Sequence, residues 1–214
     1  MTDVRVKLPT DAWIATTWED YLKLADDPDC EKVKEYYYKG RMRLETMAAT
    51  GSDHSNDHAM ILFAVNLYAV LKQIRLTAKD NCTYRKTGIR ACQPDISYYI
   101  GDRARIIPWG TSIVDLDRDP APNLAIEVSV TSLFDDLGTK RALYEEMGVR
   151  EYWIVNVKDA EILAYIIVDR GSHQIDQSIV LPELNIAVLE EALRQSRDTD
   201  QSQIGAWLMN QFQA

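Results

Sequence analysis

Residues 123–157 read NLAIEVSVTSLFDDLGTKRALYEEMGVREYWIVNV. The apolar run at 124–130 is nearly continuous, which is typical of a central strand buried on both faces. Ser132 then precedes an amphipathic stretch at 133–147, and Gly148 follows it, so we expect a helix with a serine N-cap and a glycine terminator. A second apolar run ends the segment. Strand, helix and strand in this order predict an α/β fold.

Segments on either side add the other elements of a mixed β-sheet flanked by helices. The sequence TWED at 17–20 is a capping box that predicts a short helix to about residue 25. The run at 52–74 is apolar on nearly every side, so we expect a helix that other elements cover, with Ser52 or Asp53 as its cap. We expect strands at residues 33–38, 42–47, 82–84, 96–100, 152–157 and 162–168, with a hairpin joining the first two and another joining the last two.

The length and composition predict one globular domain at residues 1–182. A chain of 214 residues with 46% hydrophobic content is long enough for a substantial core. Beyond Pro182 the chain turns polar, with helical patterns near 187–195 and 203–212. We interpret residues 183–214 as a C-terminal helical appendage packed on or beside the domain.

Charge and cysteine content argue against several functions. The net charge of −9 argues against a protein that coats nucleic acid without specificity, because phosphate contacts depend on Lys and Arg. Cys30, Cys82 and Cys92 are widely spaced without CxxC pairs, so we expect reduced thiols in a cytoplasmic protein. Residues 1–10 lack a signal-peptide core, and the apolar run at 59–71 is shorter than the roughly 18 residues of a membrane span. We expect no membrane partner and, without a P-loop or GxGxxG motif, no nucleotide cofactor.

Two carboxylates stand at the ends of separate predicted strands. Asp95 follows Pro94 directly before one apolar run, and Glu127 lies within another. Mg²⁺ takes oxygen ligands and keeps several waters, so one Asp and one Glu from neighbouring strands suffice to hold it over a phosphodiester. We expect Asp95 and Glu127 to bind Mg²⁺ or Mn²⁺, with the Val128 carbonyl completing the protein ligands.

These acids and the residues around them resemble the Uma-two family of restriction endonucleases, within the PD-(D/E)xK nuclease superfamily. The residues that carry the likeness are Gly40, His54, Pro94, Asp95, Glu127, Val128, Ser129, Thr131, Ser132, Leu133, Asp136, Lys140, Tyr144, Gly148, Val149 and the run Glu151, Tyr152, Trp153, Ile154, Val155. The resemblance implies an α/β restriction-endonuclease-like core and metal-dependent hydrolysis of DNA. It also implies a homodimer or higher homo-oligomer, for which the aromatic hairpin at 36–38 and the tail that contains Trp207 are candidate contact surfaces.

Lys140 lies in the middle of the apolar stripe of the helix predicted at 133–147, because the apolar residues around it recur at intervals of four and three. An unpaired ammonium on this face would be costly. One interpretation is an ion pair with Asp136, four residues earlier, worth about 0.2–0.5 kcal/mol. We favour the other, in which Lys140 reaches the Asp95 and Glu127 carboxylates and acts in catalysis.

The chain departs from the superfamily pattern at two places. Ser129 replaces the lysine of the standard ExK element, and in the resembling family the following helix commonly supplies that lysine, which indicates Lys140. Tyr36 occupies the position before the hairpin glycine where the family often has a glutamate. Glu35 and Glu45 are therefore accessory candidates, as a third ligand or a hydrogen-bond acceptor.

His54 and His58 are four residues apart and so share one face of a helix. A zinc site would need further ligands, and His173 is the one other histidine, so we do not expect zinc. The resemblance gives His54 an accessory role near the substrate or the metal, whereas His58 fits a packing role.

A locally basic segment precedes and follows the Pro-Asp pair. Arg85, Lys86 and Arg90 are its candidates for DNA binding. The alternative is that these side chains solvate strand edges and loops.

The sequence therefore favours a metal-dependent DNA endonuclease in which Asp95, Glu127 and Lys140 are catalytic. One alternative is an inactive binding or assembly protein that keeps the nuclease fold, since fold does not settle activity. A second is hydrolysis of RNA.

Overall fold

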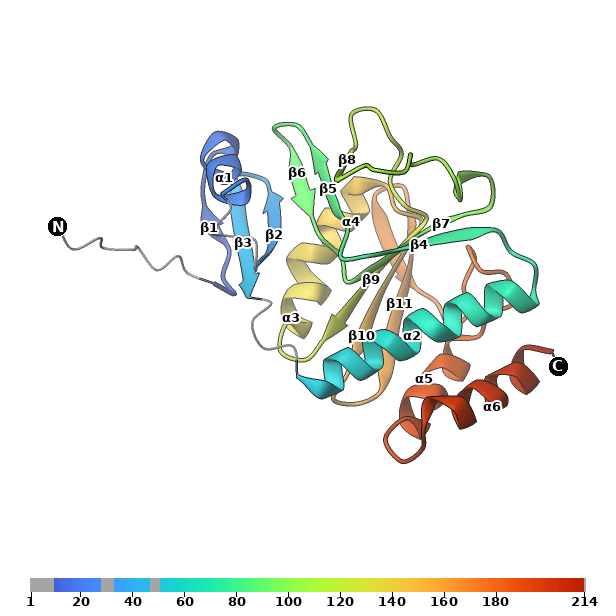
Figure 1. Ribbon diagram of the computed structural model, residues 1–214. Helices are drawn as coiled ribbons and strands as arrows, with labels where there is room; N and C mark the ends of the chain where they lie inside the picture. Colours follow the sequence, from blue (N-terminus) through green and yellow to red (C-terminus); the bar gives the residue numbers. More distant parts are fainter. Residues whose placement is uncertain (1–9, 28–32, 47–50, 214) are drawn as a thin grey trace.

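The computed structural model describes residues 10–27, 33–46 and 51–213, which form two six-stranded sheets with helices around them (Figure 1). The central sheet has the order β12-β11-β10-β9-β7-β4. Its strands are β4 (Leu76–Asp80), β7 (Ile96–Ile100), β9 (Leu124–Ser129), β10 (Glu151–Asn156), β11 (Glu161–Val168) and β12 (Gly171–Gln174). β9 is parallel to β10 and antiparallel to β7, so the sheet is mixed. The predicted α/β fold is confirmed.

β9 lies inside the central sheet and is buried along its whole length, as its apolar sequence predicts. Successive side chains point to opposite faces of a strand. Ile126 and Val128 pack in one hydrophobic cluster with helix α2 (Ser52–Leu71), whereas Ala125 packs in a second cluster on the other face. Glu127 has the same parity as Ala125, so its carboxylate lies on the face of the second cluster.

The second sheet has the order β1-β3-β2-β6-β5-β8 and was not predicted as a separate sheet. Its strands are β1 (Ile14–Ala15), β2 (Val33–Tyr38), β3 (Arg41–Thr46), β5 (Thr83–Lys86), β6 (Arg90–Cys92) and β8 (Ile113–Asp115). Tyr36 and Tyr84 from this sheet pack with Tyr99, Tyr144 and Tyr152 from the central-sheet side. This aromatic cluster joins the two sheets.

The predicted first helix is confirmed as α1 (Trp18–Ala25), and the Asp20 N–H donates to Thr17 Oγ1 at 3.1 Å as the capping box requires. The predicted cap of α2 was wrong, because the N-cap is Gly51 and it makes no side-chain cap hydrogen bond. Helix α2 also ends at Leu71, earlier than expected.

The helix predicted after β9 is interrupted. It consists of α3 (Leu133–Asp135), one π-helical turn η3 (Asp136–Lys140) and α4 (Arg141–Met147). Ser132 is the N-cap residue, as predicted, but its side chain makes no cap hydrogen bond and its Oγ donates instead to Asp136 Oδ2 at 2.6 Å. Gly148 ends the helix with φ of 85°, as predicted. Single π turns within helices occur frequently at functional sites, and this one presents Asp136 and Lys140.

The C-terminal segment contributes helices α5 (Ile186–Gln195) and α6 (Gln201–Gln213), which lie against α2 (Figure 1). Phe212 packs edge to face on Tyr68 of α2, with ring centroids 4.9 Å apart. Arg197 forms two hydrogen bonds with the fully buried carboxylate of Asp57. These helices share the hydrophobic cluster on the α2 face of the central sheet. A domain boundary at residue 182 stays a prediction.

The structure also bears on the predictions for the aromatic hairpin, the cysteines and a membrane span. Tyr36, Tyr37 and Tyr38 are buried within the chain, so they do not offer the exposed aromatic contact surface that was expected. Cys82 and Cys92 are free thiols, and Cys30 lies outside the described residues. Within the described ranges no helix has the length and apolar character needed to cross a membrane.

Candidate active site

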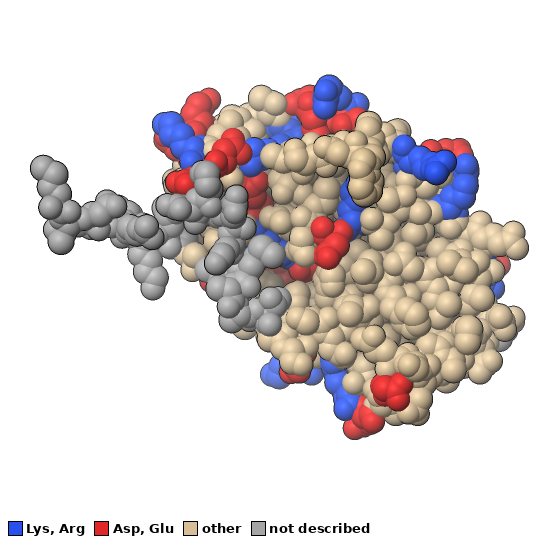
Figure 2. Space-filling view, in the orientation of Figure 1, with Lys and Arg blue, Asp and Glu red and all other residues tan. Residues whose placement is uncertain are grey.

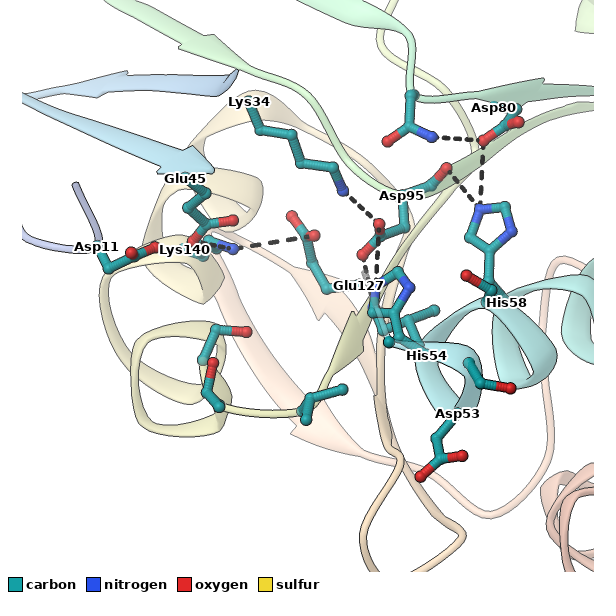
Figure 3. A pocket seen from close by; sticks show the side chains of 18 of the residues that line it. Asp11, Lys34, Glu45, Asp53, His54, His58, Asp80, Asp95, Glu127 and Lys140 are labelled. Atoms are coloured by element: carbon teal, nitrogen blue, oxygen red, sulfur yellow. Dashed lines mark hydrogen bonds and ion pairs between the residues drawn. The ribbon is translucent and has the colours of Figure 1, made fainter. Parts of the chain in front are cut away.

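A cleft of about 770 Å³ opens between the N-terminal end of α2, the C-terminal end of β9 and the β2–β3 hairpin (Figure 3). Its lining includes six of the expected site residues: Glu45, His54, Asp95, Glu127, Val128 and Lys140. The structure therefore brings together the residues proposed for metal binding and catalysis, although they come from five separate elements or connections.

Asp95 and Glu127 meet because their strands pair. Ile96 of β7 pairs with Ile126 of β9, so continuing this antiparallel register by one residue places Asp95 beside Glu127 on the same face of the sheet. Both residues are almost completely buried, with exposed fractions of 3% and 2% of the whole residue. The Val128 N–H donates to Asp95 Oδ2 at 2.8 Å and fixes the orientation of that carboxylate.

Asp95 is surrounded by positively charged and donor groups. Its Oδ1 forms an ion pair with Lys34 of β2 and lies 3.5 Å from His54 Nε2 of α2 (Figure 3). Burial would raise the pKa of Asp95, but Lys34, His54 and the Val128 N–H outweigh it and hold the pKa well below its usual range. Asp95 is therefore an anion at neutral pH.

Glu127 has a different environment. Its Oε1 accepts hydrogen bonds from the hydroxyls of Tyr36 at 3.0 Å and Tyr144 at 2.7 Å, and its Oε2 lies 3.9 Å from Lys140 Nζ. Burial is the largest influence and raises the pKa of Glu127 to about 8, against the attraction of Lys140 and with the help of the Asp95 charge. Two neighbouring carboxylates are thus held in different protonation states.

Lys140 is 1% exposed and lies among three acids. Its Nζ is 2.8 Å from Glu45 Oε1, 2.9 Å from Asp136 Oδ1 and 4.4 Å from the centre of the Tyr36 ring. Burial would lower the pKa of Lys140, but the carboxylates of Glu127, Asp136 and Glu45 raise it well above its usual value. The ion pair with Asp136 exists, and the ammonium also approaches Glu127. Among the described residues its ion-pair partners do not include Asp95, and its role in catalysis stays a prediction.

The two accessory glutamates differ. Glu45 lines the cleft, where burial would raise its pKa but Lys140 and Arg43 lower it. Glu35 lies between Lys34 and Tyr36 on β2, so strand alternation points it to the face opposite to theirs. There it forms an ion pair with Arg85 at 2.7 Å. Glu35 therefore lies outside the cleft lining, and Glu45 is the accessory acid that reaches it.

His58 also lines the cleft, next to His54. The two rings are stacked with centroids 6.2 Å apart, and His58 Nε2 lies 3.2 Å from both Asp80 Oδ1 and the Asp95 carbonyl. In the described part of the chain, no three His, Cys, Asp or Glu side chains are arranged to hold a metal ion. A site built from protein ligands alone is therefore not formed by those residues.

The donor set nonetheless fits Mg²⁺ or Mn²⁺, which bind through one or two carboxylates and retain waters. Asp95 and Glu127 supply two hard oxygen ligands in an open cleft, with Val128 beside them. Asp95 already holds a cation, since the Lys34 ammonium occupies its Oδ1. The Asp95 carboxylate, which the sequence predicts as a metal ligand, therefore already binds a positive charge.

The basic residues predicted to bind DNA are not in the cleft lining. Arg85 forms ion pairs with Glu35 and Asp26, and Arg90 is 9% exposed with its Nη2 3.5 Å from Glu146. Lys86 is half-buried on β5. Their role in DNA binding stays a prediction.

A family model described as "Putative restriction endonuclease" (Uma2) matches residues 18–200. The chain belongs to this family. Among solved structures, a chain titled as a putative nuclease belonging to DUF820 from Anabaena variabilis ATCC 29413 is 18% identical, with a TM-score of 0.58 over 83% of this chain and 98% of that one. At that identity the likeness shows the fold alone. No curated protein matches the chain.

Three site residues of this Uma2 family member were missed in the sequence. Lys34 pairs with Asp95, and the hydroxyls of Tyr36 and Tyr144 hold Glu127. Lys34 and Tyr36 are two apart on one strand and so share a face, which is the signal that could have indicated them. Tyr144 was named among the residues that resemble the family but received no role in the site, although a buried tyrosine hydroxyl usually finds a partner.

Proposed function

We propose that this chain is a metal-dependent phosphodiesterase that cleaves DNA as a cytoplasmic endonuclease. The observation that supports the proposal best is the convergence of Asp95 and Glu127 in one cleft with the buried ammonium of Lys140. Membership of a family described as restriction endonucleases agrees with it. A catalytically inactive binding or assembly protein is the second candidate, favoured by Tyr36 at the position of the family glutamate.

Asp95, Glu127 and the Val128 carbonyl would hold Mg²⁺ or Mn²⁺, which supplies an activated water and neutralises charge on the scissile phosphate. The residues of the chain prepare that site. Tyr36 and Tyr144 orient the Glu127 carboxylate, and the Val128 N–H orients Asp95.

Lys140 contributes a fixed positive charge. Its three acidic neighbours keep it protonated, so it stabilises negative charge and does not remove a proton. Glu45 and Asp136 hold the ammonium in place at 2.8 and 2.9 Å, which limits the reorganisation needed when a phosphate enters. Lys140 is therefore proposed as an electrostatic catalyst.

Contacts with DNA would extend beyond the cleft. Among the described residues, Lys34, Arg43 and Lys140 are the lysines and arginines that line it. We retain Arg85, Lys86 and Arg90 as proposed contacts with the DNA backbone. The overall charge of −9 opposes nonspecific binding of DNA.

The test is cleavage of supercoiled plasmid by purified protein in Mn²⁺, next to the variant Glu127→Gln. Nicked or linear product from the wild type alone supports the proposal. Binding of DNA without cleavage, in Mg²⁺ and in Mn²⁺, would favour the inactive binding protein. Selective cleavage of an RNA of the same sequence would move the proposal to ribonuclease activity.

We also propose a homodimer. Over α2 and α6 the surface is almost free of Lys, Arg, Asp and Glu (Figure 2), in keeping with the uncharged sequence of α6 and of α2 beyond His58. Val70 is 74% exposed and Met209 is 42% exposed. Two copies could meet here without like-charge repulsion. Light scattering should give twice the 24.5 kDa chain mass, and Val70→Glu should return it to one chain.

A further inference from the structure

Lys34 forms a buried ion pair with Asp95. Neither the predicted metal site nor the predicted catalytic residues include Lys34. The two residues are 61 positions apart, and their side chains are 11% and 5% exposed. The pair lies in the cleft that contains Glu127 (Figure 3). A cation is therefore already bound to the carboxylate proposed as a metal ligand.

The two oxygens of Asp95 are used differently. Oδ2 accepts the Val128 N–H at 2.8 Å and so is fixed by the backbone of β9. Oδ1 faces the cleft, where Lys34 and His54 contact it. A metal ion that entered the cleft would bind Asp95 most directly through Oδ1, and there it would compete with the Lys34 ammonium. Two cations on one carboxylate oxygen repel each other.

Among the described residues, fewer ion pairs hold Lys34 than hold Lys140. Within the described chain Lys34 has one ion-pair partner, whereas Lys140 has three, at 2.8, 2.9 and 3.9 Å. Lys140 is 1% exposed and held inside the core, but Lys34 lies on the cleft wall at the start of β2. A lysine carries its charge on a flexible stem of four carbons, so a small rotation moves the ammonium by several ångströms.

We propose that Lys34 is a resident cation that neutralises Asp95 in the metal-free protein, is displaced when Mg²⁺ or Mn²⁺ binds, and then contacts a phosphate of the bound DNA. This inference rests on the proposed function. Displacement keeps the charge of the cleft balanced, because the released ammonium meets the negative charge that the nucleic acid brings. Lys34 then opposes metal binding and assists substrate binding.

The test uses Lys34→Met, which keeps the apolar stem and removes the charge. Mn²⁺ titrated by calorimetry should bind this variant about tenfold more tightly than the wild type, the scale of one close charge pair. Without metal the variant should melt at a lower temperature than the wild type, since Asp95 is then buried without its cation. Saturating Mn²⁺ should raise its melting temperature more than it raises that of the wild type.

At saturating Mn²⁺ the cleavage rate of Lys34→Met should fall, although its affinity for Mn²⁺ rises. Lys34→Met should cleave plasmid at least about tenfold more slowly, mainly through a higher KM, because a phosphate contact is lost. Lys39→Met is the matched control, because this lysine lies on the same hairpin, is 65% exposed and pairs with Glu146 outside the cleft. It should change neither Mn²⁺ affinity nor cleavage.

The outcomes separate the two proposals. Absence of Mn²⁺ binding by the wild type overturns the proposed function. Binding by the wild type with equal or weaker binding by Lys34→Met overturns the role of Lys34 as a competing cation. Tighter Mn²⁺ binding by Lys34→Met with an unchanged cleavage rate overturns the proposed contact between Lys34 and a DNA phosphate. If Lys34→Met does not fold, Lys34→Gln removes the same charge but retains a donor for Asp95, and the same three comparisons apply.

Discussion

The Lys140 ammonium lies 2.8 Å from Glu45 Oε1, closer than the 3.9 Å that separates it from Glu127 Oε2. The main partner of the lysine is thus an acid on β3, and the second is Asp136 on its own helical turn. Among the described residues, removing Lys140 leaves the buried Asp136 carboxylate without a cation and leaves Glu45 with Arg43 as its cation. We therefore expect a lysine-to-methionine change to affect folding as well as the reaction.

Lys140→Met should lower both stability and cleavage. Loss of one partner from a buried ion pair costs about 3–5 kcal/mol, and loss of transition-state charge stabilisation should slow cleavage at least about a hundredfold. Urea unfolding and single-turnover plasmid cleavage measure the two effects.

The double variant Lys140→Met, Glu45→Gln separates stability from chemistry. It should recover part of the lost stability, because one of the two acids beside the missing ammonium is neutralised, and it should recover no cleavage. Recovery of cleavage would show that Lys140 serves only to neutralise its neighbours.

Glu127→Gln should abolish Mn²⁺ binding without loss of stability. At neutral pH the raised pKa favours the protonated acid, and glutamine can still accept the hydroxyls of Tyr36 and Tyr144. Thermal melting and calorimetric titration provide the measurements. Asp95→Asn is the contrasting variant, since Asp95 is a paired anion, and it should be less stable by about 3 kcal/mol. Equal melting temperatures for the two variants would contradict the assigned charge states.

Affinity for Mn²⁺ should rise with pH until about pH 8, where Glu127 loses its proton. Below that value the ion must displace the proton, so the affinity should change by about tenfold per pH unit. Calorimetry between pH 6 and pH 9 in buffers of different ionisation enthalpy gives the affinity and the number of protons released. A flat affinity over this range would show that Glu127 is already ionised.

The same shift predicts a pH dependence of stability. The unfolded chain releases this proton near the ordinary pKa of 4.5, whereas the folded chain retains it to about 8. The folded state therefore binds more protons in this window, and the contribution of Glu127 to stability is lost as pH rises from about 4.5 to 8. Without metal, the free energy of unfolding of Glu127→Gln should lack this pH dependence when urea unfolding is measured from about pH 4.5 to pH 8.

Arg197→Met should destabilise the protein although it lies far along the chain from the site. Arg197 forms an ion pair with Asp57 on α2, and Asp57 has no exposed surface. The free energy of unfolding of the variant should therefore be lower by about 2–3 kcal/mol. Arg194→Met is the matched control, because that arginine pairs with exposed Glu191, and its effect should stay below about 0.5 kcal/mol. Equal unfolding free energies for the two variants would favour a loosely attached appendage at residues 183–214.

The sequence determined the elements whose signals are local. The cap at Thr17, the terminator at Gly148 and the apolar pattern of β9 each depend on residues close together in the chain. The burial of Lys140 could also be predicted, because helical spacing places it among apolar neighbours. These features follow from hydrogen bonding and hydrophobic periodicity within one element.

Only the tertiary structure decided which charges meet. Lys34 reaches Asp95 across 61 positions, and Tyr36 reaches Glu127 across 91. Such contacts depend on strand order and on how the two sheets stack, and neither is encoded in the periodicity of one strand. The π turn at η3, which contains the buried Asp136 and Lys140, was likewise not predicted from the helical pattern. The sequence thus supplied the acids of the site, and long-range packing supplied the cations and hydroxyls that set their charge.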